Sequence, residues 1–131
     1  MKVALIAFFS VLAGCASHPI ADDNLRQRGF DPESYFVVVS PSMSPAIAAG
    51  DRVYIDRTPY AQLKIGDIVL FHPNGVACGN SDVVCHRIVA RGPWSDSWVT
   101  KGDNAEHADF PLLPENYLGR VAFVIHPQGA K

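Results

Sequence analysis

The chain has 131 residues, a formal net charge of −2 and 48% apolar residues. This length suits one domain with a modest hydrophobic core, and the apolar content excludes a disordered chain. The near-balanced charge, without a cluster of lysines or arginines, gives nucleic-acid binding no electrostatic support. Ten prolines and ten glycines are spread along the chain, which indicates many turns between short strands.

The N-terminus is typical of an export signal. It reads MKVALIAFFSVLAGC, with one lysine, then an apolar stretch, then small residues before Cys15, which is the order found in signal peptides. The apolar stretch 3–14 has 12 residues. As a helix it would be about 18 Å long, too short for a hydrocarbon core of about 30 Å. LAGC resembles the lipobox of bacterial lipoproteins, which implies cleavage before Cys15 and a lipid on its thiol. An ordinary signal peptide or a short uncleaved anchor is the alternative.

The predicted divisions are a leader at 1–14, a lipidated cysteine with a polar tether at 15–34, and one domain at 35–131. The tether shows no clear helical period, and we expect at most a short helical turn in it. Ala16 stands where lipoproteins retained at the inner membrane usually carry an aspartate. We therefore expect a lipid-anchored protein of the bacterial envelope that faces the periplasm, at the outer rather than the inner membrane.

Six segments after the tether are rich in Val, Ile, Phe and Tyr and are bounded by turn residues, a pattern typical of short strands. They are YFVVV (35–39), RVYID (52–56), DIVLFH (67–72), VVCHRIVA (83–90), SWVT (97–100) and GRVAFVI (119–125). No segment after Cys15 shows a helical period of useful length. We therefore expect a mainly β fold, a small curled antiparallel sheet or barrel.

Cys78 and Cys85 flank a Gly-Asn-Ser-Asp turn in ACGNSDVVCH. If Cys15 carries lipid, these two thiols remain, and an even number in an exported protein predicts a disulfide across the hairpin. The alternative is a metal site of His72, Cys78, Cys85 and His86, whose spacing matches no common zinc pattern. We expect neither a metal nor a cofactor.

Five segments in order resemble the type I signal peptidases and the superfamily that includes the SOS-repressor autoproteases. They are SPSMSP, GDRVYID, LKIGDIVLF, CHRIV and VTKGDNAEHAD, and the resemblance runs from about Tyr35 to Ile125. In that superfamily the nucleophile is the serine of a Ser-Met-x-Pro turn, which is Ser42 here. The turn alone would be a weak motif, whereas the ordered set is a strong one. The resemblance implies a serine endopeptidase.

The resemblance also identifies the base that would activate Ser42. The common bacterial enzymes and the SOS-type proteases carry a lysine on a central strand, whereas the matching position in VVCHRIVA is His86. That is similar to the endoplasmic-reticulum, archaeal and sporulation-type signal peptidases. Lys64 precedes a Gly-Asp turn and Lys101 belongs to the later TKGDN loop, so neither is where the lysine-type enzymes need one.

A histidine base works best when a carboxylate fixes its tautomer and stabilises the imidazolium. The matching acids are Asp103 in KGDN and Asp109 in EHAD. We predict that Asp109 is the partner of His86 and that Asp103 braces the turn, but the sequence alone does not separate the two roles. The candidate oxyanion donors are the backbone N–H of Ser42 and the hydroxyl of Ser40. Ser40 could equally satisfy its own turn.

Together these features predict a lipid-anchored serine endopeptidase that cleaves exported or pilin-like proteins after small residues through an acyl-enzyme. The client would lie extended beside YFVVV, near Phe36, Val38 and Met43, and would pair its backbone with the sheet edge. Its expected partners are an extended polypeptide and a membrane, without nucleic acid, and the chain is expected to be monomeric. The alternative is an inactive envelope lipoprotein that binds extended peptides with the same fold. An SOS-type regulator is disfavoured by the export signal and the lack of a DNA-binding segment.

Overall fold

The computed structural model describes residues 5–9, 19–73 and 83–127, with side chains from residue 23 onward. Within these ranges the fold is mainly β, as predicted. Seven strands form one sheet in the order β1-β2-β3-β7-β4-β5-β6, and every neighbouring pair is antiparallel. The strands are β1 (Leu5–Phe9), β2 (Ser34–Val38), β3 (Arg52–Asp56), β4 (Ile68–Phe71), β5 (Val84–Arg91), β6 (Trp98–Lys101) and β7 (Tyr117–Ile125). The helical elements include α1 (Pro19–Gln27) and the short 3₁₀ helices η1 (Tyr60–Gln62) and η3 (Pro114–Asn116).

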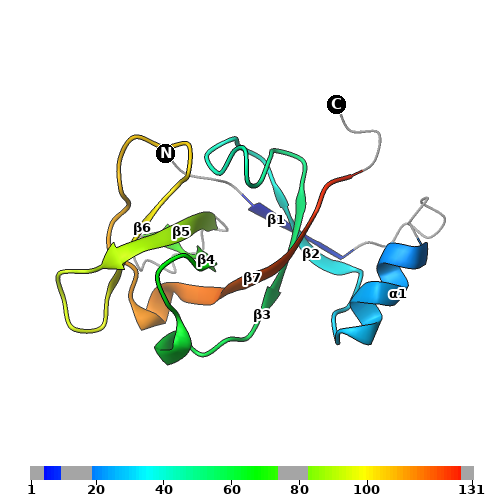
Figure 1. Ribbon diagram of the computed structural model, residues 1–131, viewed down its shortest axis with the longest axis horizontal. Helices are drawn as coiled ribbons and strands as arrows, with labels where there is room; N and C mark the ends of the chain where they lie inside the picture. The colour runs from blue at the N-terminus through cyan, green and yellow to red at the C-terminus, as the bar shows by residue number, and fades with distance from the viewer. Residues whose placement is uncertain (1–4, 10–18, 74–82, 128–131) are drawn as a thin grey trace.

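Strand β7 joins the two halves of the sheet. It pairs with β3 on one side and with β4 on the other, so the early strands and the later hairpins share one long central strand (Figure 1). Both pairings contain a register shift, at Tyr54/Ile55 and at Leu70/Phe71. Such irregularities bend a strand and increase its twist. The sheet is therefore curled but open, with β1 and β6 at its edges, and it is not a closed barrel.

The two Gly-Asp signals of the sequence form the same kind of turn. Gly50 and Gly66 have φ values of 95° and 101°, in the left-handed region that glycine adopts without strain. The following Asp51 and Asp67 each accept a hydrogen bond from the backbone N–H three residues earlier, at 2.8 Å and 3.0 Å. These turns lead directly into β3 and β4, which explains why both strands begin close to where the sequence predicts them.

The core consists of two apolar clusters that meet at β5. The first contains Val38, Met43, Ile47, Val53, Leu70, Val83 and Cys85. The second contains Leu63, Val69, Phe71, Val84, Ile88, Trp98 and Leu112. Strand β5 contributes to both because successive side chains of a strand point to opposite faces. His86 therefore shares the strand face of Val84 and Ile88, on the strand next to the edge strand β6.

Strand β1 lies within residues 1–14, which the sequence predicts to be a leader outside the fold. Its backbone pairs with β2 along the full length of both strands, from Leu5↔Val38 to Phe9↔Ser34. Extended apolar backbone readily adds to an exposed sheet edge. In the uncleaved chain the outer edge of β2 is therefore occupied.

The predicted tether also differs from the structure, because its described part packs on the sheet. It contains the nine-residue helix α1, whose Leu25 is 3% exposed. After α1, Phe30 lies edge-on to Tyr54 and to Phe123, and the Tyr54 hydroxyl donates to the Pro32 carbonyl. Figure 1 shows α1 at the β2 end of the sheet, away from β6. Among the described residues, no helix has the length and apolarity needed to cross a membrane.

Candidate active site

Ser42 lies in the turn that follows β2, and its neighbours hold it in place. Met43 and Ile47 are 0% and 1% exposed and belong to the first core cluster. Backbone hydrogen bonds from Ser44 to Pro41 (3.0 Å) and from Ile47 to Met43 (2.9 Å) close the turn. Ser42 itself is only 2% exposed. The Ser-Met-Ser-Pro run is therefore a tight turn whose methionine is anchored in the core, which fixes the serine beside it.

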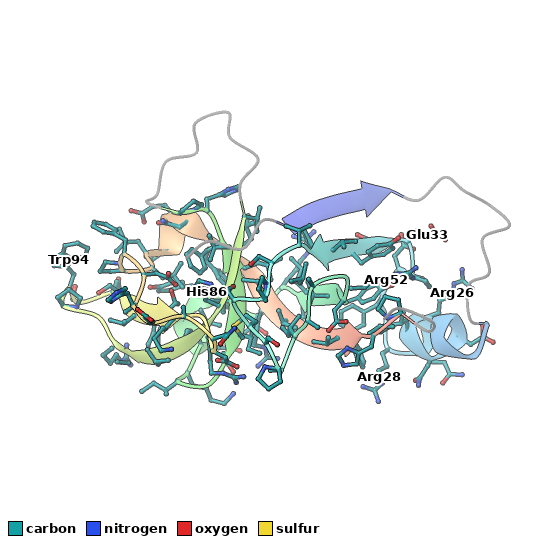
Figure 2. The ribbon with its side chains drawn as sticks, turned by 90° about the horizontal axis from the view of Figure 1, so that it is seen from above. Arg26, Arg28, Glu33, Arg52, His86 and Trp94 are labelled. Carbon is teal, nitrogen blue, oxygen red and sulfur yellow. The ribbon has the colours of Figure 1, made fainter. Side chains whose placement is uncertain are left out.

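His86 is brought to this serine by β5. It is 0% exposed and lies near the middle of the molecule (Figure 2). Its Nε2 atom is 3.1 Å from Oγ of Ser42, although the two residues are 44 positions apart. The ring of Phe71, from the neighbouring β4, lies edge-on to the imidazole with 6.5 Å between centroids. The serine hydroxyl and the imidazole therefore meet in a site shielded from bulk water.

Asp109 completes the line on the other side of the imidazole. Its Oδ2 atom is 2.5 Å from Nδ1 of His86, and it also accepts a hydrogen bond from the Thr100 hydroxyl at 2.8 Å. An ionised carboxylate can only accept, so in a neutral imidazole Nδ1 would carry the proton and Nε2 would be left to accept one from Ser42. This is the arrangement in which an imidazole can act as a base toward a serine.

Asp103 has a different partner. The guanidinium of Arg87 donates two hydrogen bonds to its carboxylate, from Nε to Oδ1 at 2.9 Å and from the second amino group to Oδ2 at 2.8 Å. The hydrogen bonds from Arg87 hold the pKa of Asp103 below its ordinary value, against the opposing effect of burial. The same contact raises the pKa of Arg87. Asp103 thus forms a two-pronged ion pair beside the line of Ser42, His86 and Asp109.

The KGDN loop packs directly against the serine and the histidine. A Cβ atom at Gly102 would lie 2.7 Å from the Ser42 carbonyl oxygen and 2.9 Å from Nε2 of His86, so only glycine fits. The next residues hold the serine turn, since the backbone N–H of Asn104 donates to the Ser42 carbonyl at 2.8 Å. The ammonium of Lys101 donates to the carbonyls of Gly102 and Ala105, both at 2.8 Å. That lysine therefore braces the loop.

Ser40 lies next to the serine that would react. The backbone N–H of Ser42 donates to the Ser40 hydroxyl at 3.4 Å, so the two predicted oxyanion donors are neighbours. Lys64 was the other lysine considered as a possible base. Its side chain is 71% exposed and pairs with Asp67 at 3.3 Å.

Several known proteins are similar to this chain in sequence. No protein-family profile and no solved structure matches the chain. The signal peptidase complex catalytic subunit of Neurospora crassa is 34% identical over 96 residues, which cover 68% of this chain and 52% of the relative. The same subunit of Metarhizium acridum is 32% identical over 95 residues, with the same coverage. The probable thylakoidal processing peptidase 2, chloroplastic, of Arabidopsis thaliana is 34% identical over 104 residues, 70% of this chain and 27% of that protein. The chain is a homologue of the type I signal peptidases. It spans about half the length of the fungal relatives it matches.

In this structure, with β1 paired to β2, the predicted substrate-binding side chains lie against the first core cluster. Val38 and Met43 are 1% and 0% exposed, and Phe36 packs against the same core cluster. A peptide beside β2 could reach the backbone of that strand but not the side chains of Val38 and Met43. The sequence pattern missed this because a run of apolar residues does not reveal which of them face the core.

The cysteine predictions fall partly outside the described residues. Cys15 and Cys78 lie there, so lipidation and the disulfide stay predictions. Cys85 is a free thiol in this structure, packed in the first core cluster. Burial raises the pKa of this thiol to about 12. No three His, Cys, Asp or Glu side chains within 5–9, 19–73 and 83–127 are grouped so that they could hold a metal ion.

Sequence reasoning missed three residues that support the candidate site in this signal peptidase homologue. Arg87 binds Asp103, Thr100 binds Asp109, and Gly102 allows the close approach of the loop. Arg87 could have been suspected, because it follows His86 directly in the quoted CHRIV segment. Thr100 carries no signal of its own in the sequence, since a threonine in a strand is common.

Proposed function

We propose that this chain is a serine endopeptidase of the signal-peptidase type, with Ser42 as nucleophile, His86 as general base and Asp109 as the group that orients His86. The observation that carries the proposal is the continuous line from Oγ of Ser42 through the imidazole to the Asp109 carboxylate, with contacts of 3.1 Å and 2.5 Å. A serine hydroxyl is a weak nucleophile until an adjacent base takes its proton. Homology to signal peptidases supports the same activity.

The proposed reaction follows from these contacts. Oγ of Ser42 attacks the scissile carbonyl carbon while Nε2 of His86 takes the hydroxyl proton, and Asp109 stabilises the imidazolium. The negative charge that develops on the carbonyl oxygen needs donors. The proposed donors are the Ser40 hydroxyl and the backbone N–H of Ser42, which in this structure donates to that hydroxyl at 3.4 Å. His86 returns the proton to the leaving amine, which leaves an acyl-enzyme on Ser42. Water, activated by His86, then hydrolyses that ester.

The client is proposed to be an exported polypeptide, in extended form, cut after small residues. The pairing of β1 with β2 supports the extended form, because it is an instance of apolar backbone adding to the edge of the strand that leads into the Ser42 turn. Cleavage before Cys15 would remove Leu5–Phe9 and leave β2 as the edge strand. The mature protein would then be tethered to the bacterial envelope by the lipid on Cys15, close to a restricted set of clients such as pilin-like proteins.

The test uses the purified mature protein, which lacks residues 1–14 and so leaves the outer edge of β2 free, and a fluorogenic peptide with an Ala-x-Ala sequence before the cut. The wild type should cleave it, and Ser42→Ala should not. Ser44→Ala is the matched control, because Ser44 lies in the same turn and should leave cleavage unchanged. Equal rates in the wild type and Ser42→Ala would overturn the proposal. Peptide binding without cleavage in both proteins would favour the inactive peptide-binding lipoprotein.

A further inference from the structure

Thr100 makes two hydrogen bonds to the candidate orienting carboxylate residue. Its hydroxyl donates to Oδ2 of Asp109 at 2.8 Å, and its carbonyl accepts from the Asp109 backbone N–H at 2.8 Å. Thr100 is 0% exposed and belongs to β6, where it pairs with Ile88 of β5. It therefore joins Asp109, which is in a loop, to the strand beside the one that carries His86.

The oxygen that Thr100 holds is the same one that contacts the imidazole. Oδ2 of Asp109 accepts from the threonine hydroxyl and from Nδ1 of His86. A second donor restricts the rotation of the carboxylate, so the carboxylate spends less time in orientations that lack the hydrogen bond to the imidazole. Small errors in the position of catalytic groups are costly, since a displacement of about 1 Å can lower a rate by about 10²-fold.

We infer that Thr100 is a positioning residue, which sets the Asp109 carboxylate, and through it the tautomer and orientation of His86, for proton transfer from Ser42. This inference rests on the proposed function. Thr100 would act through Asp109, because its side chain is buried and its hydroxyl donates to that carboxylate. Its loss should lower kcat and leave KM unchanged.

The structure offers a matched control elsewhere in the sheet. The hydroxyl of Thr58 donates to Oδ1 of Asp56 at 2.6 Å, the same threonine–aspartate contact at the end of β3. The backbone N–H and the hydroxyl of Thr58 both donate to Asp56, and neither bonds to Ser42, His86 or Asp109. Thr58→Val removes an equivalent hydrogen bond and should leave kcat unchanged.

Two measurements on the mature protein, without residues 1–14, test the inference. The first is kcat and KM for the Ala-x-Ala peptide. Thr100→Val, which keeps the shape, and Thr100→Ala should each lower kcat by about tenfold or more, whereas Thr100→Ser should restore it. When Asp109 is already replaced by alanine, adding Thr100→Val should change kcat by less than about twofold, because groups that act through one another are not additive.

The second measurement does not depend on activity. The Nδ1 proton of His86 in a hydrogen bond to a carboxylate gives a low-field proton resonance, assigned by its absence in His86→Gln. It should shift or broaden in Thr100→Val and Thr100→Ala and remain in Thr100→Ser and Thr58→Val. An unchanged resonance together with a wild-type kcat in both hydroxyl-free variants would overturn the role of Thr100. A wild type that does not cleave, but whose resonance still depends on the Thr100 hydroxyl, would overturn the proposed function and leave the positioning role standing.

Discussion

Oδ2 of Asp109 lies 2.5 Å from Nδ1 of His86, while Asp103 is held by Arg87. Asp109→Asn should lower kcat by about 10³- to 10⁴-fold, because the amide can donate to Nδ1 and so move the imidazole proton to the nitrogen that faces the serine. Asp103→Asn should lower kcat by less than about tenfold, since it only loosens the adjacent loop. Peptide-cleavage kinetics of both variants decide this, and a larger loss in Asp103→Asn would reverse the two roles.

The contact between Ser42 and His86 predicts that activity depends on this histidine, because a general base must accept the serine proton. His86→Ala should lose nearly all activity, and His86→Lys should not restore it, because a lysine at this buried position would have to shed its charge. Full activity in His86→Ala would exclude the serine–histidine mechanism.

The Asp103–Arg87 pair predicts a dependence of stability on pH. The pKa of Asp103 in the folded state is below its ordinary value of 3.8, so the pair stabilises the fold above about pH 4 and this stabilisation is lost as the pH falls through the folded-state pKa. Asp103→Asn should lower the free energy of unfolding at about pH 7 by about 1 kcal/mol, and the difference from wild type should shrink toward about pH 2.

Urea unfolding at both pH values measures this difference. Glu106→Gln is the control, because its side chain is 90% exposed and its removal should have little effect at either pH. A difference between the wild type and Asp103→Asn that is constant across the range would contradict an electrostatic origin.

Gly102 predicts a steric effect on catalysis. In Gly102→Ala the new Cβ would meet the Ser42 carbonyl and Nε2 of His86, so the two groups must separate and kcat should fall by about 10²-fold. Gly119→Ala is the matched control, because its Cβ would also crowd backbone, the carbonyl of Asp56 at 2.9 Å. It should lower the melting temperature without a comparable loss of kcat. Equal kcat values in the two alanine variants would show that Gly102 is only a structural requirement.

The reactivity of Cys85 distinguishes a free buried thiol from the disulfide predicted with Cys78. Burial raises the pKa of its thiol to about 12, and the thiolate is the form that reacts with alkylating reagents. A free Cys85 should therefore resist iodoacetamide in the folded protein at about pH 8 and react once the protein is unfolded. A bridge to Cys78 would instead leave both residues unreactive after unfolding without reductant, with a mass two hydrogens lower.

Much of the site could be read from local sequence. The strands 52–56, 67–72 and 83–90 lie within one or two residues of β3, β4 and β5, because β-branched residues bounded by Gly-Asp turns specify short strands locally. Ser42 and His86 came from a resemblance that depends on the order of several motifs. In the structure the serine turn and the His-Arg-Ile-Val strand meet at the contact between these two residues.

The tertiary structure alone decided which aspartate meets His86. Asp103 and Asp109 lie in one irregular loop, where no period tells which way a side chain points. Arg87 of β5 pairs with Lys101 of β6, so the residues that follow Lys101 lie close to Arg87. The guanidinium of Arg87 therefore binds the Asp103 carboxylate. The loop then returns alongside β6, where the backbone of Asp109 bonds to Thr100 and its carboxylate reaches the imidazole. The burial of Val38 and Met43, the docking of Leu25 and the support from Thr100 were likewise decided by packing between distant segments, which a local pattern does not encode.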